Sequence, residues 1–170
     1  MLYCRYMDIY TLIVAGHVIG TILGVGGATI AEFQIAKALN DKQVSPDERA
    51  LMHVNYTMIR VGMVVILISV IAMFWYHLSL GNTWIFTSEK LWIKDLMFVM
   101  IFLNAIALQK RWVPLWLGAS ISFTSWWGAA LLGMAGRLPY SFTTYLISYI
   151  VAIFLMAFLL HYVRQYITSR

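Results

Sequence analysis

Charged residues are scarce in this chain, and their scarcity bounds its class. Of 170 residues, 11% are Asp, Glu, Lys or Arg, whereas 62% are hydrophobic. A soluble domain of this size could not cover so much apolar surface with so few charges. The deficit is concentrated in five runs that contain no charged residue, 9–31, 61–88, 96–109, 112–136 and 138–163. The composition therefore predicts a membrane protein whose main partner is the lipid bilayer.

Cysteine is nearly absent as well. Because Cys4 is the only one, an intramolecular disulfide and a dithiol redox pair are excluded. The sequence contains no HxxxH, CxxC or HExxH motif, no phosphate-binding loop and no nucleophile elbow. The net charge of +5 is not gathered into a patch dense enough for nucleic acid, so no nucleic-acid partner is expected.

The charge-free runs have the length of membrane-spanning helices. A bilayer core about 30 Å thick needs roughly 20 apolar residues per helix. Four runs meet that length alone, whereas the run at 96–109 is short and must draw in Lys94 and Asp95 or stop short. We predict an all-α bundle that forms one domain over residues 1–170. Its five transmembrane helices are expected at about 8–39, 46–80, 88–110, 114–134 and 141–167.

Both ends of the second helix carry local sequence patterns. Ser45, Pro46 and Glu48 predict a capping box with proline at the first helical position. At the other end, Gly81 followed by Asn82 predicts a C-cap. These two patterns fix the boundaries of this helix more firmly than those of its neighbours.

The basic residues are divided unequally between the two ends of the predicted bundle. One end carries four, Arg5, Lys90, Lys94 and Arg137. The other carries seven, Lys37, Lys42, Arg49, Lys110, Arg111, Arg164 and Arg170. We expect a multi-pass protein of a bacterial inner (plasma) membrane. Since cytoplasmic loops are enriched in Lys and Arg, its N-terminus is expected outside and its C-terminus in the cytoplasm.

His17 is the first polar residue expected at depth. Gly20 and Gly24 stand three and seven residues after it, so they share its helix face. Glycines on such a face usually admit the backbone of another helix. The alternative is that they leave a flat gap for a porphyrin whose iron His17 binds. The sequence leaves both interpretations open.

Lys94 and His77 are further candidates in the outer half. Lys94 is expected near the outer edge of the hydrocarbon. There it either extends its ammonium to the headgroups or neutralises an acidic ligand group, such as a haem propionate or a substrate carboxylate. His77 is expected closer to the surface than His17. It is either an interfacial side chain or a second axial ligand.

Glu32 and Arg60 are expected in the inner half at similar depths. Because an unpaired charge at that depth is costly, we predict that they form an ion pair between the first two helices. This pair would be either a structural clamp or part of a proton or ion path. Asn104, in the middle of the third helix, is expected to hydrogen-bond to another helix.

Two short segments resemble known families. They are His17 to Gly20, and Leu91 to Lys94 followed by Gln109 to Arg111 and Pro114. A histidine in the first helix, with Trp-x-Lys and a basic end in the third, resembles the copper-resistance protein D family and HemJ-type protoporphyrinogen oxidases. The resemblance covers about residues 9–114. It implies haem b at His17 and an activity that depends on Lys94.

The leading hypothesis is a haem-b protein that acts in electron transfer or as an oxidoreductase. His17 and His77 would bind the iron, Gly20 and Gly24 would make room for the ring, and Lys94 would be the catalytic residue. A second hypothesis is a copper or small-solute permease with an inner gate lined by Glu32, His53 and Arg60. A third is a non-catalytic subunit whose glycine face docks a partner helix. A homo-oligomer or a redox partner is compatible with each.

Overall fold

The computed structural model describes residues 2–41, 45–136 and 138–168, and these are helical apart from short connections. The predicted all-α fold with five helices is confirmed. The elements are α1 (Leu2–Asp41), α2 (Pro46–Ser79), the short 3-10 helix η1 (Trp84–Phe86), α3 (Glu89–Gln109), α4 (Leu115–Met134) and α5 (Phe142–Thr168). The main departure is at the start of α1, which begins at Leu2 rather than near Asp8.

The predicted ends of α2 are confirmed. The Glu48 amide donates to Ser45 Oγ at 3.2 Å, and the Ser45 amide donates to the Glu48 carboxylate at 3.0 Å, which completes the capping box. Gly81 has a φ of +70°, a conformation that favours glycine. Its amide donates to the Leu78 carbonyl, and that of Asn82 donates to the His77 carbonyl. This pair of bonds is a Schellman C-cap.

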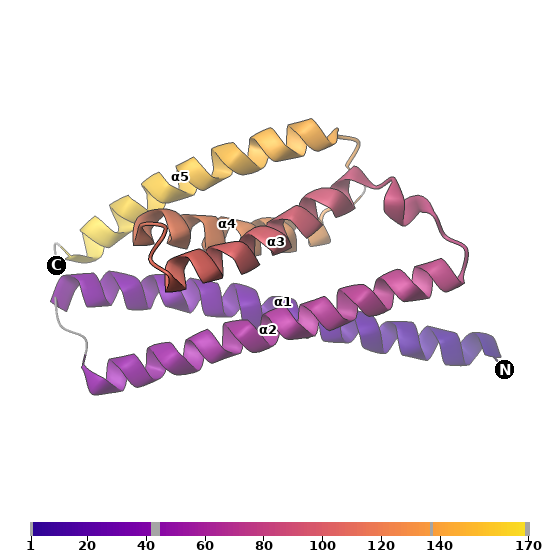
Figure 1. Ribbon diagram of the computed structural model, residues 1–170, viewed down its shortest axis with the longest axis horizontal. Coiled ribbons are helices and arrows are strands. Elements are labelled where there is room, and N and C mark those ends of the chain that lie inside the picture. The colour runs from indigo at the N-terminus through magenta and orange to yellow at the C-terminus, as the bar shows by residue number, and fades with distance from the viewer. Residues whose placement is uncertain (1, 42–44, 137, 169–170) are drawn as a thin grey trace.

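The helices form two groups joined through α1. The helices α1 and α2 run antiparallel and cross as a long pair, while α3, α4 and α5 lie together on one side of α1 (Figure 1). Within the second group α4 is central, because it packs against α1, α3 and α5. The last turns of α1, α3 and α5 and the first turns of α2 and α4 lie at the same end of the bundle (Figure 1).

Glycines set the distance between α1 and α2. A Cβ added to Gly20 would lie 3.0 Å from the Gly62 carbonyl oxygen. A Cβ added to Gly62 would lie 2.9 Å from the Gly20 carbonyl oxygen. The two backbones therefore touch at this crossing, in the manner typical of small residues between membrane helices.

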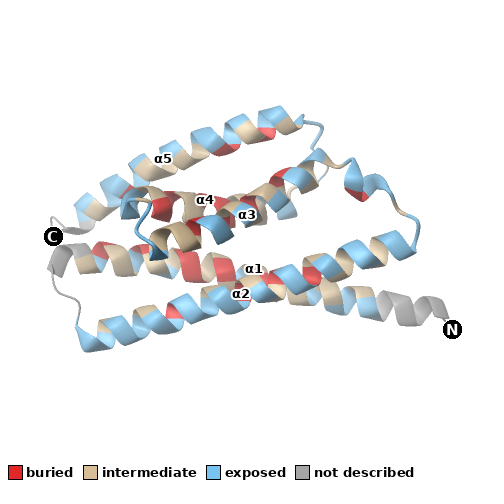
Figure 2. Ribbon diagram, viewed as in Figure 1, coloured by how far each residue is buried: buried red, intermediate tan, exposed pale blue. Residues whose placement is uncertain are grey.

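Four of the five helices, α1, α2, α3 and α5, are long and apolar enough to cross a membrane. Their outward faces expose many large apolar side chains, as lipid contact requires; Trp75 on α2, for example, is 76% exposed. The chain is therefore a multi-pass membrane protein. The fifth helix, α4, is not among these four, and it carries several Ser, Thr and Trp residues. Ser120, Thr124, Ser125 and Trp126 are buried against the neighbouring helices (Figure 2).

Candidate functional site

His17 lies on α1 where that helix meets α2. Its Nδ1 is 3.0 Å from the Ser69 hydroxyl, and that hydroxyl donates its single proton to the Ile66 carbonyl at 2.8 Å. The Nδ1–H of His17 is therefore the donor to Ser69, which makes Nε2 the unprotonated nitrogen of the neutral ring. Within the part of the chain that the structure describes, Nε2 has no hydrogen-bond partner.

Lys94 reaches the same level of the bundle from α3. Its Nζ is 3.9 Å from the position of a Cβ added to Gly133 on α4. Gly24 of α1 packs against Trp126 of α4, and the two helices are antiparallel. His17, seven residues before Gly24, is therefore level with Gly133, seven residues after Trp126.

The neighbouring Lys90 already binds backbone carbonyl groups at the end of α4. Its Nζ donates to the carbonyl oxygens of Ala135 and Gly136, the latter at 2.9 Å, as cations near a helix C-terminus commonly do. Lys94 has no such partner. Over residues 2–41, 45–136 and 138–168, no hydrogen bond or ion pair reaches its half-buried ammonium. The next residue in the chain, Asp95, is acidic, but the two side chains form no ion pair in this part of the structure.

Protein side chains pack against the glycine face beside His17. A Cβ on Gly24 would lie 2.0 Å from the Trp126 ring, and one on Gly20 would lie 2.8 Å from the Ile66 side chain. The space that these glycines leave is thus filled by an indole ring and by α2. This arrangement fits the helix-packing interpretation of Gly20 and Gly24, whereas a cofactor beside them stays a prediction.

His77 is not brought to His17. Since His17 is level with Ser69, His77 lies eight residues further along α2, or about 12 Å at 1.5 Å per residue. Its Nδ1 is 3.4 Å from the side-chain nitrogen Nδ2 of Asn82, and its ring contacts Tyr10 and Trp84. A single haem iron could not take both imidazoles as axial ligands in this arrangement. Among the described residues, no group of three His, Cys, Asp or Glu side chains could hold a metal ion.

The ion pair predicted for Glu32 has a different partner. Its carboxylate accepts a hydrogen bond from Arg164 of α5 at 2.6 Å, and both side chains are about nine-tenths buried, at 10% and 11% exposed. The prediction that Arg60 is the partner of Glu32 was wrong, because the Arg60 side chain points outward from α2. Its guanidinium carbon lies 4.4 Å from the centre of the Tyr56 ring. The side chains of His53 and Arg60 are exposed, so they do not line an inner gate with Glu32.

Buried amides join the helices elsewhere. Asn104 of α3 donates to the Gly118 carbonyl of α4 at 2.7 Å, which confirms the interhelical bond expected of it. Asn55 of α2, which the sequence reasoning missed, donates to the Gly27 carbonyl of α1 at 3.0 Å. Ser69 and Gly133 were missed too, because a serine or a glycine in a membrane helix carries no pattern that assigns it to a site.

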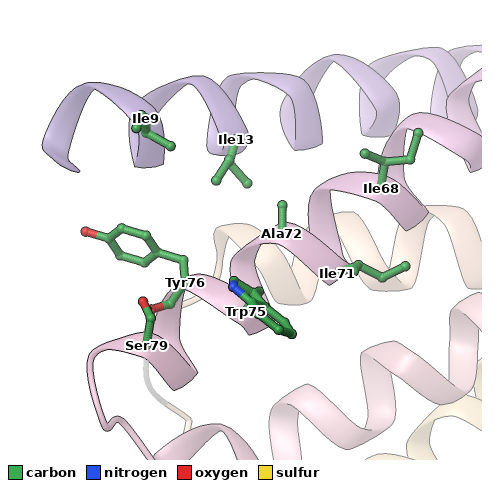
Figure 3. A pocket seen from close by; sticks show the side chains of 8 residues that line it. All are labelled: Ile9, Ile13, Ile68, Ile71, Ala72, Trp75, Tyr76 and Ser79. Carbon is green, nitrogen blue, oxygen red and sulfur yellow. The ribbon is translucent and has the colours of Figure 1, made fainter. Parts of the chain in front are cut away.

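An apolar groove of about 670 Å³ lies at the N-terminal end of α1, where α1 and α2 diverge (Figure 3). Tyr76 and Ser79 are at its outer end, and neither His17 nor Lys94 contributes to it. Its lining residues are Ile9, Ile13, Ile68, Ile71, Ala72, Trp75, Tyr76 and Ser79. The groove is therefore separate from the polar site between α1, α2, α3 and α4.

Comparisons with family models, with characterised proteins and with solved structures each give no match. The class of the protein follows from its own fold and chemistry. It is a helical multi-pass membrane protein with one half-buried imidazole and one half-buried ammonium group at the same level of the bundle. The name "His17–Lys94 site" is used below for His17, Ser69, Lys94 and Gly133.

Proposed function

We propose that the protein binds the carboxylate of a membrane-soluble small molecule at the His17–Lys94 site. The observation that carries this proposal is the arrival of His17 and Lys94 at one level of the bundle from different helices. Each brings a polar atom for which no hydrogen-bond partner is found among the described residues. A carboxylate supplies both an ion-pair partner and an acceptor for the N–H groups of Lys94.

The membrane setting favours such a ligand. An ammonium group held at membrane depth is costly unless it is paired. The contribution of Lys90 at the end of α4 leaves Lys94 without a structural task of the same kind. A molecule that partitions into the bilayer can enter between helices, and its acidic group can then pair with Lys94. His17 Nε2, an acceptor in the neutral ring, can take the proton of the entering acid and then donate it to the second carboxylate oxygen.

A titration with a fluorescent fatty acid tests this proposal. The purified protein in detergent is titrated with cis-parinaric acid and with its uncharged methyl ester. We expect the acid to bind more tightly than the ester. A hydrogen bond to a charged group contributes more binding free energy than a hydrogen bond between neutral groups. Lys94→Gln should therefore weaken acid binding by about tenfold to a hundredfold. The same substitution should leave ester binding unchanged.

Lys37→Gln is the matched control, since it removes the same charge from a side chain that is 66% exposed at the other end of the bundle. It should leave the preference for the acid intact. If Lys94→Gln and Lys37→Gln behave alike, or if acid and ester bind equally well, the proposal fails.

Haem is a second probe, because it carries two propionates and is the cofactor that the sequence resemblance implies. The filled glycine face leads us to expect no Soret band that depends on His17. A stoichiometric Soret band that disappears in His17→Ala would replace the carboxylate proposal with the haem hypothesis.

A further inference from the structure

A second polar cluster lies at the α3–α4 end of the bundle, where a side chain at the end of α3 reaches α2. Gln109 Nε2 donates to the Tyr56 hydroxyl at 2.7 Å, which ties the last residue of α3 to the first half of α2. The Arg60 guanidinium carbon lies 4.4 Å from the centre of the same Tyr56 ring. Lys110 follows Gln109 directly in the chain, and Arg111 follows Lys110. These five residues are called the α2–α3 corner.

The three cations of the α2–α3 corner have no acidic partner. The ion pairs found among the described residues are Lys37–Glu48 and Glu32–Arg164, and neither involves Arg60, Lys110 or Arg111. Aromatic rings hold two of the cations instead. Arg60 lies over Tyr56, and the Lys110 ammonium lies 4.6 Å from the centre of the Trp112 ring. All three side chains are exposed, so their N–H groups remain available to a ligand.

The position of the corner defines the kind of ligand. Trp112 is 70% exposed beside the α3–α4 turn, where a Trp at the end of a membrane helix lies among the lipid headgroups. Arg60 belongs to the membrane-spanning part of α2, and its contact with Tyr56 directs it toward the same end. Basic residues gathered between helices at the membrane surface bind the phosphates of anionic lipids.

We propose that the α2–α3 corner binds the headgroup phosphate of an anionic phospholipid from the adjacent leaflet. Arg60 approaches the phosphate from α2, while Lys110 and Arg111 approach it from the α3–α4 turn. The acyl chains lie against the exposed apolar face of α2, which includes Val61 and Val64. The bound lipid links α2 to α3, which the Tyr56–Gln109 hydrogen bond joins at this end. This proposal does not depend on the His17–Lys94 site.

Lipid retention in native mass spectrometry tests the proposal. The protein is reconstituted in nanodiscs of phosphatidylcholine with phosphatidylglycerol added, released, and analysed for bound lipid. We expect phosphatidylglycerol to be retained in preference to phosphatidylcholine. Each basic residue near an anionic surface contributes a similar share of the binding free energy. Arg60→Gln and Lys110→Gln should therefore each lower the retention of phosphatidylglycerol about fivefold.

Arg49→Gln is the matched control. Arg49 is an exposed cation of the same helix at the same end of the bundle, but it lies outside the corner. An equal loss of phosphatidylglycerol in Arg49→Gln would overturn the proposal, since the effect would then be diffuse attraction. If Arg60→Gln fails to fold, Lys110→Gln alone decides, because Lys110 lies exposed at the end of α3.

Inorganic phosphate distinguishes a lipid from a free anion. Thermal unfolding is measured in phosphatidylcholine nanodiscs with added phosphatidylglycerol or with added phosphate at constant ionic strength. We expect the melting temperature to rise with the lipid and to stay unchanged with phosphate. A rise with phosphate equal to that with the lipid would show a free-anion site and overturn the assignment to lipid.

Discussion

Glu32 shows how the position of one charged side chain follows from its surroundings. A carboxylate buried at membrane depth is costly unless an opposite charge meets it. The helix α2, which packs against α1, carries Arg60, but the register of the two helices places Arg60 at a different level from Glu32. Gly20 lies against Ile66 and Gly27 against Ile59, so Arg60 is level with residue 26, about 9 Å from Glu32. Arg164 of α5 is level with Glu32 and forms the pair.

Substitution of Glu32 or Arg164 should therefore destabilise the protein. Removal of one partner of a buried ion pair costs roughly 3–5 kcal/mol, because the other charge is left unpaired. We expect Glu32→Gln and Arg164→Gln each to lower the melting temperature in detergent strongly. The double variant should recover much of the loss. Arg60→Gln, on an exposed side chain, should change the melting temperature little, and additive losses for Glu32→Gln and Arg164→Gln would contradict the pairing.

At the scale of the helices, the sequence predicts what is local and misses what depends on neighbours. The capping box at Ser45 and the C-cap at Gly81 are fixed within a few residues of chain, so both were predicted. The shared face of His17, Gly20 and Gly24 was also predicted, because it follows from helical periodicity. What fills that face was not predictable, because Trp126 arrives from a helix a hundred residues later in the chain.

The same limit applies to the candidate site. His17 and Lys94 were singled out because polar side chains are rare in these segments, and the structure places them at one level of the bundle. Ser69 and Gly133, which complete the site, have no such mark in the sequence. The partner of Glu32 was also beyond the sequence, since nothing local shows that α5 lies beside α1.

The crossing of α1 and α2 makes a prediction about glycine. An added methyl group at Gly20 or Gly62 would meet the backbone of the other helix, so Gly20→Ala and Gly62→Ala should each destabilise by about 1–3 kcal/mol. Gly16 has no atom within 4 Å of an added Cβ, so Gly16→Ala is the control. Because alanine favours a helix, Gly16→Ala should be neutral or slightly stabilising. Equal melting temperatures for all three variants would contradict this close crossing.

At the scale of the whole molecule, the two groups of helices create the polar site. The α1–α2 pair supplies His17 and Ser69, whereas the α3–α4–α5 group supplies Lys94 and Gly133. The site therefore exists only when the α3–α4–α5 group packs against α1. A ligand that bridges His17 and Lys94 would stabilise this packing, since binding to the folded state alone raises stability.

A double-mutant cycle on carboxylate binding tests the joint action of His17 and Lys94 most directly. The affinity for cis-parinaric acid is measured for the wild type, His17→Ala, Lys94→Gln and the double variant. If both residues contact one carboxylate, the double variant should lose clearly less binding free energy than the sum of the two single losses. Strictly additive losses, or affinities that neither substitution changes, would show that the two residues do not form one binding site.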